Sequence, residues 1–321
     1  MSTQTDVETE DVGQRGAVER LRASPFLSEL LSNRLALAGL SMIFAMVAIG
    51  LYARLFIDLA TVSQSQIGTN PNLAPPSWLG QKPTQMVTDY GAWAYPFGTD
   101  IQSRDIFSRV LYGAWLALMY GTITVGASTV LGVGLGILAA YYGDLTDNVI
   151  MRTMDVLLAF PSLLLALALV AIFGAGLWKA VIALTLVYTP RFARVVRGAA
   201  LKVLEDEYIE ATEALGAKDP RVIVRHILPN CLAPITVQST LNFGLAIIDL
   251  AALSFLGFGA EAGTPSWGLM LSNGVNQGLL TGDWWWSFFP GLFLAITVLG
   301  FNLLGDGMRD ALDPRMRETV D

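Results

Sequence analysis

The chain has 321 residues, of which 53% are apolar and only 15% are charged. Soluble domains carry about 25% charged residues, so the composition excludes an ordinary soluble protein and indicates several membrane spans. A net charge of −7, one cysteine and one histidine disfavour nucleic-acid binding, an internal disulfide and a clustered metal site.

Residues 1–30 form a polar segment without hydrophobic periodicity, and its acidic residues include Asp6, Glu8, Glu10 and Asp11. Such a segment cannot bury enough apolar surface to fold, so we predict an acidic, disordered tail. A solvated linker explains this acidity better than adaptation to high salt does. The apolar run that follows lacks a small-residue cleavage site, so we predict a retained first span and not a signal peptide.

Six apolar stretches are long enough to cross a bilayer, which takes about 20 residues in a helix. They lie at 35–57, 115–141, 156–174, 179–196, 236–258 and 288–304. Pro161 is expected to kink the third helix. The fourth is the least typical, because Pro190, Arg191 and Arg194 crowd its end. We therefore predict an all-α membrane protein with six transmembrane helices.

Orientation follows from the lysines and arginines, which are retained on the cytoplasmic side. With a cytoplasmic N-terminus, fifteen of the 20 basic residues fall in inner segments, and both termini are cytoplasmic. The chain then divides into a tail at 1–30, an N-terminal extension with the first span at 31–57, an extracytoplasmic loop at 58–110, a five-helix core at 111–310 with a cytoplasmic loop at 203–229, and a C-terminal tail at 311–321. The tryptophans at 284–286 are expected in an aromatic belt, with outer-vestibule packing as the alternative.

The cytoplasmic loop includes the sequence KVLEDEYIEATEALGAKDPRVIVRHILPN. We predict a first helix at 204–215 that ends at Gly216, because glycine adopts the left-handed C′ conformation without a Cβ penalty. Asp219 then serves as the N-cap, and Pro220 as the first residue, of a second helix at 220–228. Two such helices form a rigid projection, and the residues alone leave an ordinary interhelical loop as an equal alternative.

Glu210, Ala211 and Gly216, followed by Leu228 and Pro229, resemble the EAA motif of ABC importer permeases. Thr212 replaces the second alanine of the motif, and His226 its isoleucine, which we interpret as a packing variant and not a proton switch. In that family the loop contains the coupling helix, which docks in a cleft on the ATPase subunit. The resemblance therefore assigns ATPase coupling to Glu210, Ala211, Ala214, Gly216, Asp219, Arg221, Arg225, His226, Leu228 and Pro229.

Three further stretches restrict the resemblance to one branch of this family. They are GTDIQSRDIFSRVLYGAW at 98–115, LSFLGFGAEAGTPSWGLML at 253–271 and NLLGDGMRDALDPR at 302–315. They are similar to the dipeptide, oligopeptide and nickel permeases, in particular to the subunit with an N-terminal extension. The chain departs from that pattern in its outer segments, with Ser103 for glycine, Trp115 for arginine, Ala117 for serine, and Ala262 and Gly263 for a proline pair.

The resemblance implies the transmembrane subunit of a peptide-type ABC importer in a prokaryotic cell membrane. The implied partners are a second homologous permease, two ATPase subunits, an extracytoplasmic substrate-binding protein and membrane lipid. ATP and magnesium would be bound by the ATPase subunits, so no cofactor is expected in this chain. Dipeptides, oligopeptides and nickel stay open as substrates.

The residues themselves disfavour catalysis in this chain. The sequence has no Gly-Lys pair and so no P-loop, and its one histidine lies in the cytoplasmic loop. The GVGLG stretch at 132–136 lies mid-span without a flanking strand, so we interpret it as close helix packing and not as a dinucleotide site. A secondary transporter is disfavoured because no internal repeat is evident, and a scaffold or channel subunit is the remaining alternative.

Three polar residues of the fifth span are candidates for lining a pathway: Gln238, Asn242 and Asp249. An acid in hydrocarbon costs about 2.5–3.5 kcal/mol on insertion scales, so Asp249 must face protein or water. The related permeases often have glutamate one position later, where this chain has Leu250. The alternative role for Asp249 is a hydrogen bond to a neighbouring span, which we favour.

Overall fold

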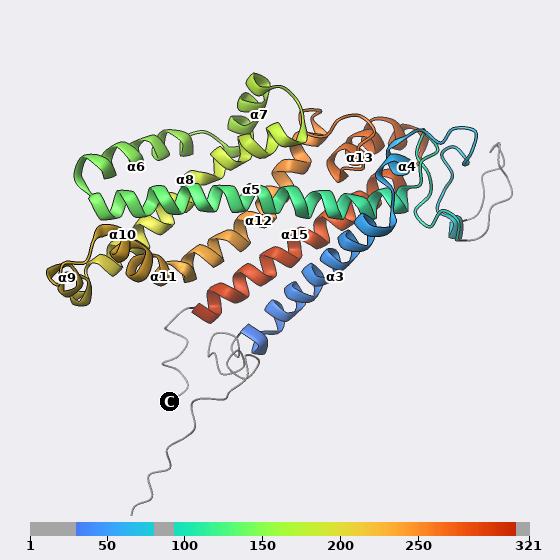
Figure 1. Cartoon of the computed structure of the whole chain (residues 1–321). Coiled ribbons are helices and arrows are strands. Elements are labelled where there is room, and N and C mark those ends of the chain that lie inside the picture. The colour runs from blue at the N-terminus through green and yellow to red at the C-terminus, as the bar shows by residue number, and fades with distance from the viewer. Residues whose placement is uncertain (1–29, 80–92, 313–321) are drawn as a thin grey trace, which may run out of the picture.

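The computed structural model describes residues 30–79 and 93–312 (Figure 1). Within these ranges the regular structure is helical, apart from two isolated β-bridges. The predicted tails at 1–30 and 311–321 lie almost wholly outside the described residues. The predicted all-α class is confirmed.

Four helices are long and apolar enough to cross a membrane. They are α3 (Arg34–Phe56), α5 (Ile106–Tyr142), α12 (Leu232–Phe255) and α15 (Trp285–Leu312). These helices coincide with the first, second, fifth and sixth predicted spans. α5 begins earlier than predicted because the Asp105 carboxylate caps it, accepting hydrogen bonds from the backbone N–H groups of Phe107 and Ser108 at 3.2 and 3.0 Å.

The third predicted span is not one helix. α6 (Asp144–Leu158) and α7 (Ser162–Phe173) meet at a bend of 95°. Pro161 explains the break, because it lacks an N–H and holds an extended backbone with a ψ of 131°. α7 has 12 residues, about 18 Å at ~1.5 Å per residue, against about 30 Å of hydrocarbon. The third predicted span at 156–174 is therefore not one straight helix, and the predicted interruption at Pro161 is confirmed.

α8 (Leu177–Leu204) contains the fourth predicted span and extends beyond it at both ends. Its second half carries Arg191, Arg194 and Arg197, so composition does not class it with the four apolar helices. By length and composition, the described part of the chain holds four spans, or five if α6 and α7 form one broken span. The predicted number of six is reached only when α8 is counted as well.

Glycines bring α5 and α8 into close contact, as the GVGLG stretch predicted. A Cβ atom on Gly132 would lie 2.7 Å from the carbonyl oxygen of Thr189, and one on Gly136 would lie 2.6 Å from that of Ala193. Real Cβ atoms essentially never approach other atoms so closely, so only glycine fits at these two positions. In Figure 1, α5 runs along the length of the molecule beside α8 and α12.

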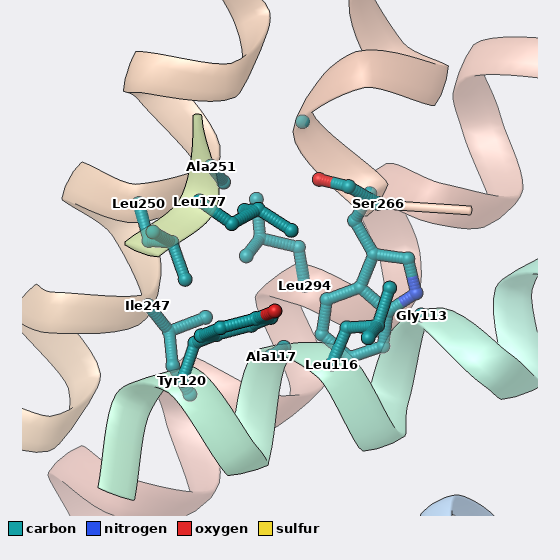
Figure 2. A pocket seen from close by; sticks show the side chains of 12 residues that line it. Gly113, Leu116, Ala117, Tyr120, Leu177, Ile247, Leu250, Ala251, Ser266 and Leu294 are labelled. Carbon is teal, nitrogen blue, oxygen red and sulfur yellow. The ribbon is translucent and has the colours of Figure 1, made fainter. Parts of the chain in front are cut away.

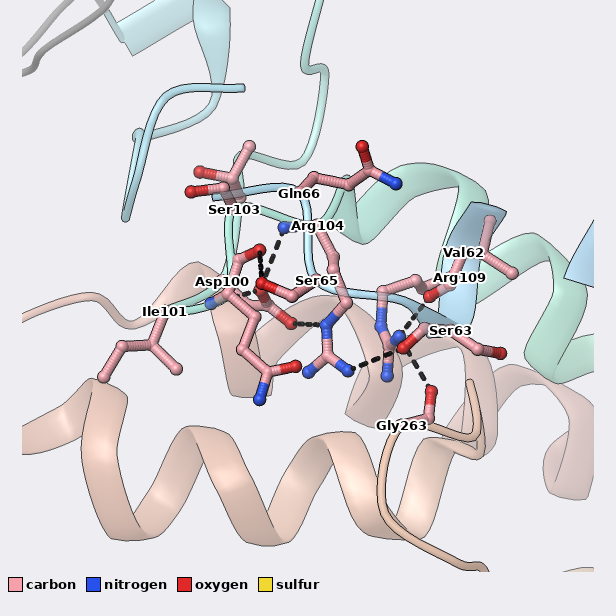
Figure 3. Close-up of polar contacts among 12 residues, drawn as sticks. Val62, Ser63, Ser65, Gln66, Asp100, Ile101, Ser103, Arg104, Arg109 and Gly263 are labelled. Atoms are coloured by element: carbon pink, nitrogen blue, oxygen red, sulfur yellow. Dashed lines mark hydrogen bonds and ion pairs between the residues drawn. The ribbon is translucent and has the colours of Figure 1, made fainter. Parts of the chain in front are cut away.

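The described part of the segment between α3 and α5 folds around a buried ion pair (Figure 3). Arg104 Nε lies 2.7 Å from Asp100 Oδ2, and the two side chains are 4% and 0% exposed. The other Asp100 oxygen accepts hydrogen bonds from the backbone N–H groups of Gln102 and Arg104. Ser103, which replaces the glycine of similar permeases, has a φ of 57°. Glycine adopts this left-handed conformation without strain, which explains the usual residue there.

Arg109 joins three segments near the start of α5 (Figure 3). This residue of α5 is 1% exposed, and its guanidinium donates hydrogen bonds to the carbonyl oxygens of Val62, Gly263 and Thr264. Val62 belongs to α4 (Leu59–Ser63), and the other two lie in the loop before α13 (Trp267–Asn273). One buried cation therefore fastens both of these segments to α5.

Two of the three tryptophans at 284–286 do not form the predicted aromatic belt. Trp285 and Trp286 are 3% and 2% exposed and pack in one cluster with Ile106 and Met270. Trp284 is 39% exposed. Hydrophobic burial between the ends of α5, α13 and α15 therefore outweighs a position at the interface, and the alternative of packing is confirmed for Trp285 and Trp286.

Arg109→Met removes the guanidinium but keeps much of the apolar length of the side chain. We expect the free energy of unfolding to fall by roughly 3 kcal/mol, because one buried and two half-buried carbonyl oxygens lose their donor. Thermal unfolding of the detergent-solubilised protein, followed by circular dichroism, measures this change. Arg54→Met is the matched control, since Arg54 is exposed near the end of α3. Equal unfolding midpoints for the two variants would contradict the stabilising role of Arg109.

Candidate functional site

Short helical segments form the connection between α8 and α12, which we call the 205–230 loop. α9 (Glu207–Ala214) is followed by α10 (Asp219–Val222), a π-helical turn (Ile223–Ile227) and α11 (Leu228–Asn230). Figure 1 shows α9, α10 and α11 together at one end of the molecule, with α4 and α13 at the other. The predicted helix–turn–helix is confirmed in outline, but its first helix begins at Glu207 because α8 continues to Leu204.

Gly216 closes α9, as predicted, with a φ of +83°. The Gly216 N–H donates to the carbonyl oxygen of Glu213 at 2.8 Å, and the Ala217 N–H donates to that of Thr212 at 3.3 Å. These two bonds form a Schellman motif, which satisfies carbonyl groups at the helix end. A Cβ atom on Gly216 would meet nothing within 4 Å, so only the backbone conformation requires glycine here.

The second helix differs from the prediction at both ends. Lys218 is the N-cap, and Asp219 is already helical, because the Asp219 carboxylate does not cap the helix and instead accepts a hydrogen bond from the Tyr142 hydroxyl at 3.4 Å. The helix also continues through Pro229 and does not end before it. The π-helical turn precedes Pro229, which lies in the first turn of α11. A proline at such a position loses no helical hydrogen bond.

Aliphatic side chains anchor the 205–230 loop to the rest of the molecule. Ile209, Val222 and Ile227 are 2%, 0% and 0% exposed. They share a hydrophobic cluster with Ile137 of α5 and Val203 of α8. Each buried aliphatic side chain contributes about 1.5–3 kcal/mol relative to exposure. The loop is therefore held in place as a core element would be.

Polar side chains brace the same loop. The Tyr141 hydroxyl donates to Glu213 Oε1 at 3.2 Å. Asn230 Nδ2 donates to the Tyr208 hydroxyl at 3.1 Å and to the His226 carbonyl oxygen at 2.7 Å, while the His226 and Tyr208 rings lie 6.1 Å apart. These contacts agree with a packing role for His226. The contacts that Tyr141 and Tyr208 make in the loop were not predicted from the sequence. The only local signal for them was the tyrosine pair at the end of α5.

Most of the predicted loop residues face outward. The exposed ones are Glu210, Ala211, Ala214, Gly216, Asp219, Arg221, Arg225 and Pro229, and the half-buried ones are His226 and Leu228. Leu215, which was not predicted, is 90% exposed. Because residues three and four apart share a helix face, Ala211, Ala214 and Leu215 form one exposed apolar strip on a rigid helix. Such a strip among charged residues is typical of a protein contact surface.

The predicted pathway residues fall into two groups. Gln238 Nε2 donates to Asn242 Oδ1 at 3.0 Å, so these two lie together. Asn242 is 1% exposed, and its Nδ2 has no partner among the described residues. Asp249 is engaged elsewhere, because it accepts a hydrogen bond from the Tyr188 hydroxyl of α8 at 2.7 Å. This bond supports helix pairing for Asp249, and the lining of a pathway by the three residues stays a prediction.

An apolar cavity lies between α5, α12 and α13 (Figure 2). Its lining includes Leu116, Tyr120, Ile247 and Trp267, and none of its 12 residues is charged. The Tyr120 hydroxyl points toward the cavity in Figure 2. A site for a coupling ion needs several oxygen ligands, so this cavity does not favour the secondary-transporter alternative.

Comparison with known proteins gives consistent matches. Residues 132–318 match the family described as binding-protein-dependent transport system inner membrane component. The dipeptide transport system permease protein of Alkalihalophilus pseudofirmus is 44% identical over 90% of this chain and 88% of its own length. The di/tripeptide transport system permease protein of Pseudomonas aeruginosa is 40% identical over 92% of this chain and 93% of its own length.

The fold also resembles a solved structure. A chain of the MetNI methionine ABC transporter in an inward-facing conformation has a TM-score of 0.51 and 20% identity. The match covers 64% of this chain and 97% of that chain. At this identity the likeness concerns the fold alone.

Ile209→Ala removes a buried anchor of the 205–230 loop. We expect the free energy of unfolding to fall by roughly 3 kcal/mol, because a cavity replaces the lost side-chain atoms. The loop should also open more often, so trypsin should cleave after Lys218 and Arg221 faster than in the unaltered protein. Leu215→Ala is the matched control, because that side chain is 90% exposed and its loss should leave the cleavage rate unchanged. Equal rates for the two variants would contradict the anchoring role.

Proposed function

Because the chain belongs to the family of inner membrane components of binding-protein-dependent transport systems, we propose that it forms half of the translocation pathway of an ATP-driven peptide importer. Members of this family are membrane permease subunits, and ATP hydrolysis belongs to a separate subunit. The chain accordingly has the all-helical permease fold of type I ABC importers. Its task is to change the access of the pathway when a partner supplies the energy.

The observation that carries the proposal is the rigid 205–230 loop with its exposed apolar strip. α9 is closed by the Schellman motif at Gly216, and the loop is anchored by Ile209, Val222 and Ile227. α9 begins two residues after α8 ends, and one residue, Cys231, separates α11 from α12. A force applied to the strip of Ala211, Ala214 and Leu215 therefore reaches two long helices without being lost in a mobile segment.

Energy can reach the pathway only if the ATPase binds the loop differently in two states of the permease. We propose that the exposed strip inserts into a cleft on the ATPase subunit and that Glu210, Arg221 and Arg225 form charged contacts around it. Small residues at 211 and 214 permit close approach, and Leu215 supplies the apolar anchor that such interfaces concentrate at their centre.

The substrate is a short peptide in this proposal, because the relatives named above transport dipeptides or di- and tripeptides. The partners are an extracytoplasmic binding protein, a second homologous permease and two ATPase subunits. The 205–230 loop and both termini lie in the cytoplasm, since most lysines and arginines gather on that side. Gln238, Asn242 and Asp249 are proposed to line or support the pathway.

Reconstitution tests the proposal directly. The chain is co-expressed with its second permease and ATPase subunits and placed in proteoliposomes, and the uptake of a labelled dipeptide is measured with the binding protein present. We expect uptake that requires both ATP and the binding protein. Uptake of nickel instead of the peptide would correct the substrate. Purification without an ATPase or a second permease would contradict the importer assignment.

Leu215→Asp should weaken ATPase binding. A carboxylate on the exposed strip must lose water in the interface, so we expect the dissociation constant of the ATPase subunit to rise about tenfold. Leu280→Asp is the matched control, because Leu280 is 86% exposed in α14 (Leu279–Thr281), which lies between α13 and α15 in the chain and outside the 205–230 loop. Binding of the ATPase to the detergent-solubilised permease pair is measured for both variants. An unchanged dissociation constant for Leu215→Asp would exclude the strip from the interface.

Gly216→Val should uncouple ATP hydrolysis from transport. A β-branched residue strains a backbone that has a φ of +83°, so the end of α9 must change its conformation. We expect normal membrane insertion but loss of ATP-driven uptake. Gly126→Val is the control, because Gly126 lies in α5 with open space around its Cβ position and without a positive φ. Normal uptake in Gly216→Val would refute the coupling role of the loop.

A further inference from the structure

Asp249 connects α12 to α8 within the helix bundle. Its carboxylate accepts a hydrogen bond from the Tyr188 hydroxyl at 2.7 Å, and Tyr188 is completely buried. Loss of either partner would leave the other polar group without this bond in a medium that supplies little water.

The Tyr188 side chain also packs against α7. Ala166 and Val170 of α7 are completely buried, and they lie in one hydrophobic cluster with Tyr188 of α8 and Leu250 of α12. The side chain of Ser162, the first residue of α7, faces the Asp249 carboxylate. α7, which begins immediately after the 95° bend, is therefore packed against the helices that the bond between Tyr188 and Asp249 joins.

Arg191 completes this group of residues, which we call the Asp249 cluster. The Arg191 guanidinium carbon lies 5.2 Å from the centre of the Tyr188 ring, and its charge acts on the Asp249 carboxylate. A cation over an aromatic face at this distance is attractive. The cluster thus joins α7, α8 and α12 through four side chains: Ser162, Tyr188, Arg191 and Asp249.

α6 is attached on the other side of the bend. Arg197 of α8 forms two hydrogen bonds to Asp147, and Arg194 of α8 forms an ion pair with Asp155. α6 is therefore tied to the part of α8 that leads to the 205–230 loop, whereas α7 packs against Tyr188 and α12. The bend at Pro161 lies between these two attachments.

We propose that Asp249 is a positioning residue that couples displacement of the 205–230 loop to the angle between α6 and α7. α8 is continuous from Tyr188 to Leu204, about 24 Å at ~1.5 Å per residue, and α9 begins after two further residues. Movement of α8 shifts Tyr188 against Asp249. The carboxylate passes that shift to α12, and the packing of Tyr188 against Ala166 and Val170 passes it to α7. Asp249 is then the residue within the helix bundle at which movement of the 205–230 loop reaches α12.

This inference rests on the proposed function, so it is tested in the reconstituted importer with the binding protein present. The measured quantity is the number of ATP molecules hydrolysed per peptide taken up. It is compared between variants at equal amounts of assembled complex. We expect Tyr188→Phe and Asp249→Asn to raise this ratio roughly fivefold, because each weakens the hydrogen bond that transmits the movement. The double variant should be no worse than either single variant. Asp249→Glu should recover part of the coupling.

Tyr52→Phe is the matched control, because it removes the same hydroxyl from an exposed tyrosine of α3. Hydrogen exchange of the backbone at 159–165 is the second measurement, since it reports the bend itself. In the unaltered complex we expect exchange to differ between the nucleotide-free and ATP-bound states, and in Asp249→Asn this difference should disappear.

The outcomes separate the two ideas. Absence of ATP-dependent uptake by the unaltered complex would refute the proposed function. Normal uptake by that complex together with an unchanged ratio in Tyr188→Phe and Asp249→Asn would overturn only the role of Asp249. Variants that lower thermal stability but keep both the ratio and the exchange difference would show a purely structural bond, and would overturn the inference as well.

Discussion

The close contact between α5 and α8 is the constraint on which the arrangement of the molecule depends. Gly132 and Gly136 carry no side chain, so the two helix backbones lie against each other. α8 is one continuous helix of 28 residues. Its end therefore fixes where α9 begins, and its middle presents Tyr188 to α12. A larger residue at either glycine would displace the 205–230 loop and the Asp249 cluster together, because both depend on the position of α8.

The two ends of the molecule are held by different chemistry. At the end with α4 and α13, buried Arg109 and the ion pair of Asp100 and Arg104 fasten irregular backbone whose carbonyl groups need donors. At the end with the 205–230 loop, aliphatic burial at Val222 and Ile227 anchors short helices. The first end is therefore specified by hydrogen bonds, whereas the loop end is specified mainly by packing and leaves Glu210, Arg221 and Arg225 exposed.

Features that depend on neighbouring residues could be predicted from the sequence. The left-handed Gly216, the interruption at Pro161 and the apolar lengths of α3 and α12 are examples, because each follows from local sterics or from the thickness of a bilayer. The severity of the 95° bend could not be predicted, since it depends on what α7 packs against. The candidate functional site could be predicted only as a region of the chain, the loop at 203–229. The side-chain contacts that anchor this loop could not be predicted.

Contacts between distant segments account for what the sequence does not show. Tyr188 and Asp249 are 61 positions apart, and Tyr141 and Glu213 are 72 apart, so no local pattern pairs them. Burial of Trp285 and Trp286 was missed for the same reason, because an aromatic run at the end of a span suits either an interface or a core. The shift of the N-cap to Lys218 shows how a tertiary hydrogen bond redirects a side chain from its usual local role.

The short helix α7 has a consequence for how the chain meets lipid. It spans about 18 Å, and its outward side chains are apolar, with Leu164 61% and Ile172 78% exposed. Around a solitary chain, lipid must thin or rearrange to match this helix, at a free-energy cost that grows with the mismatch. A neighbouring subunit that covers α7 removes the cost. The mismatch therefore favours any protein contact that covers α7 over exposure of this helix to lipid.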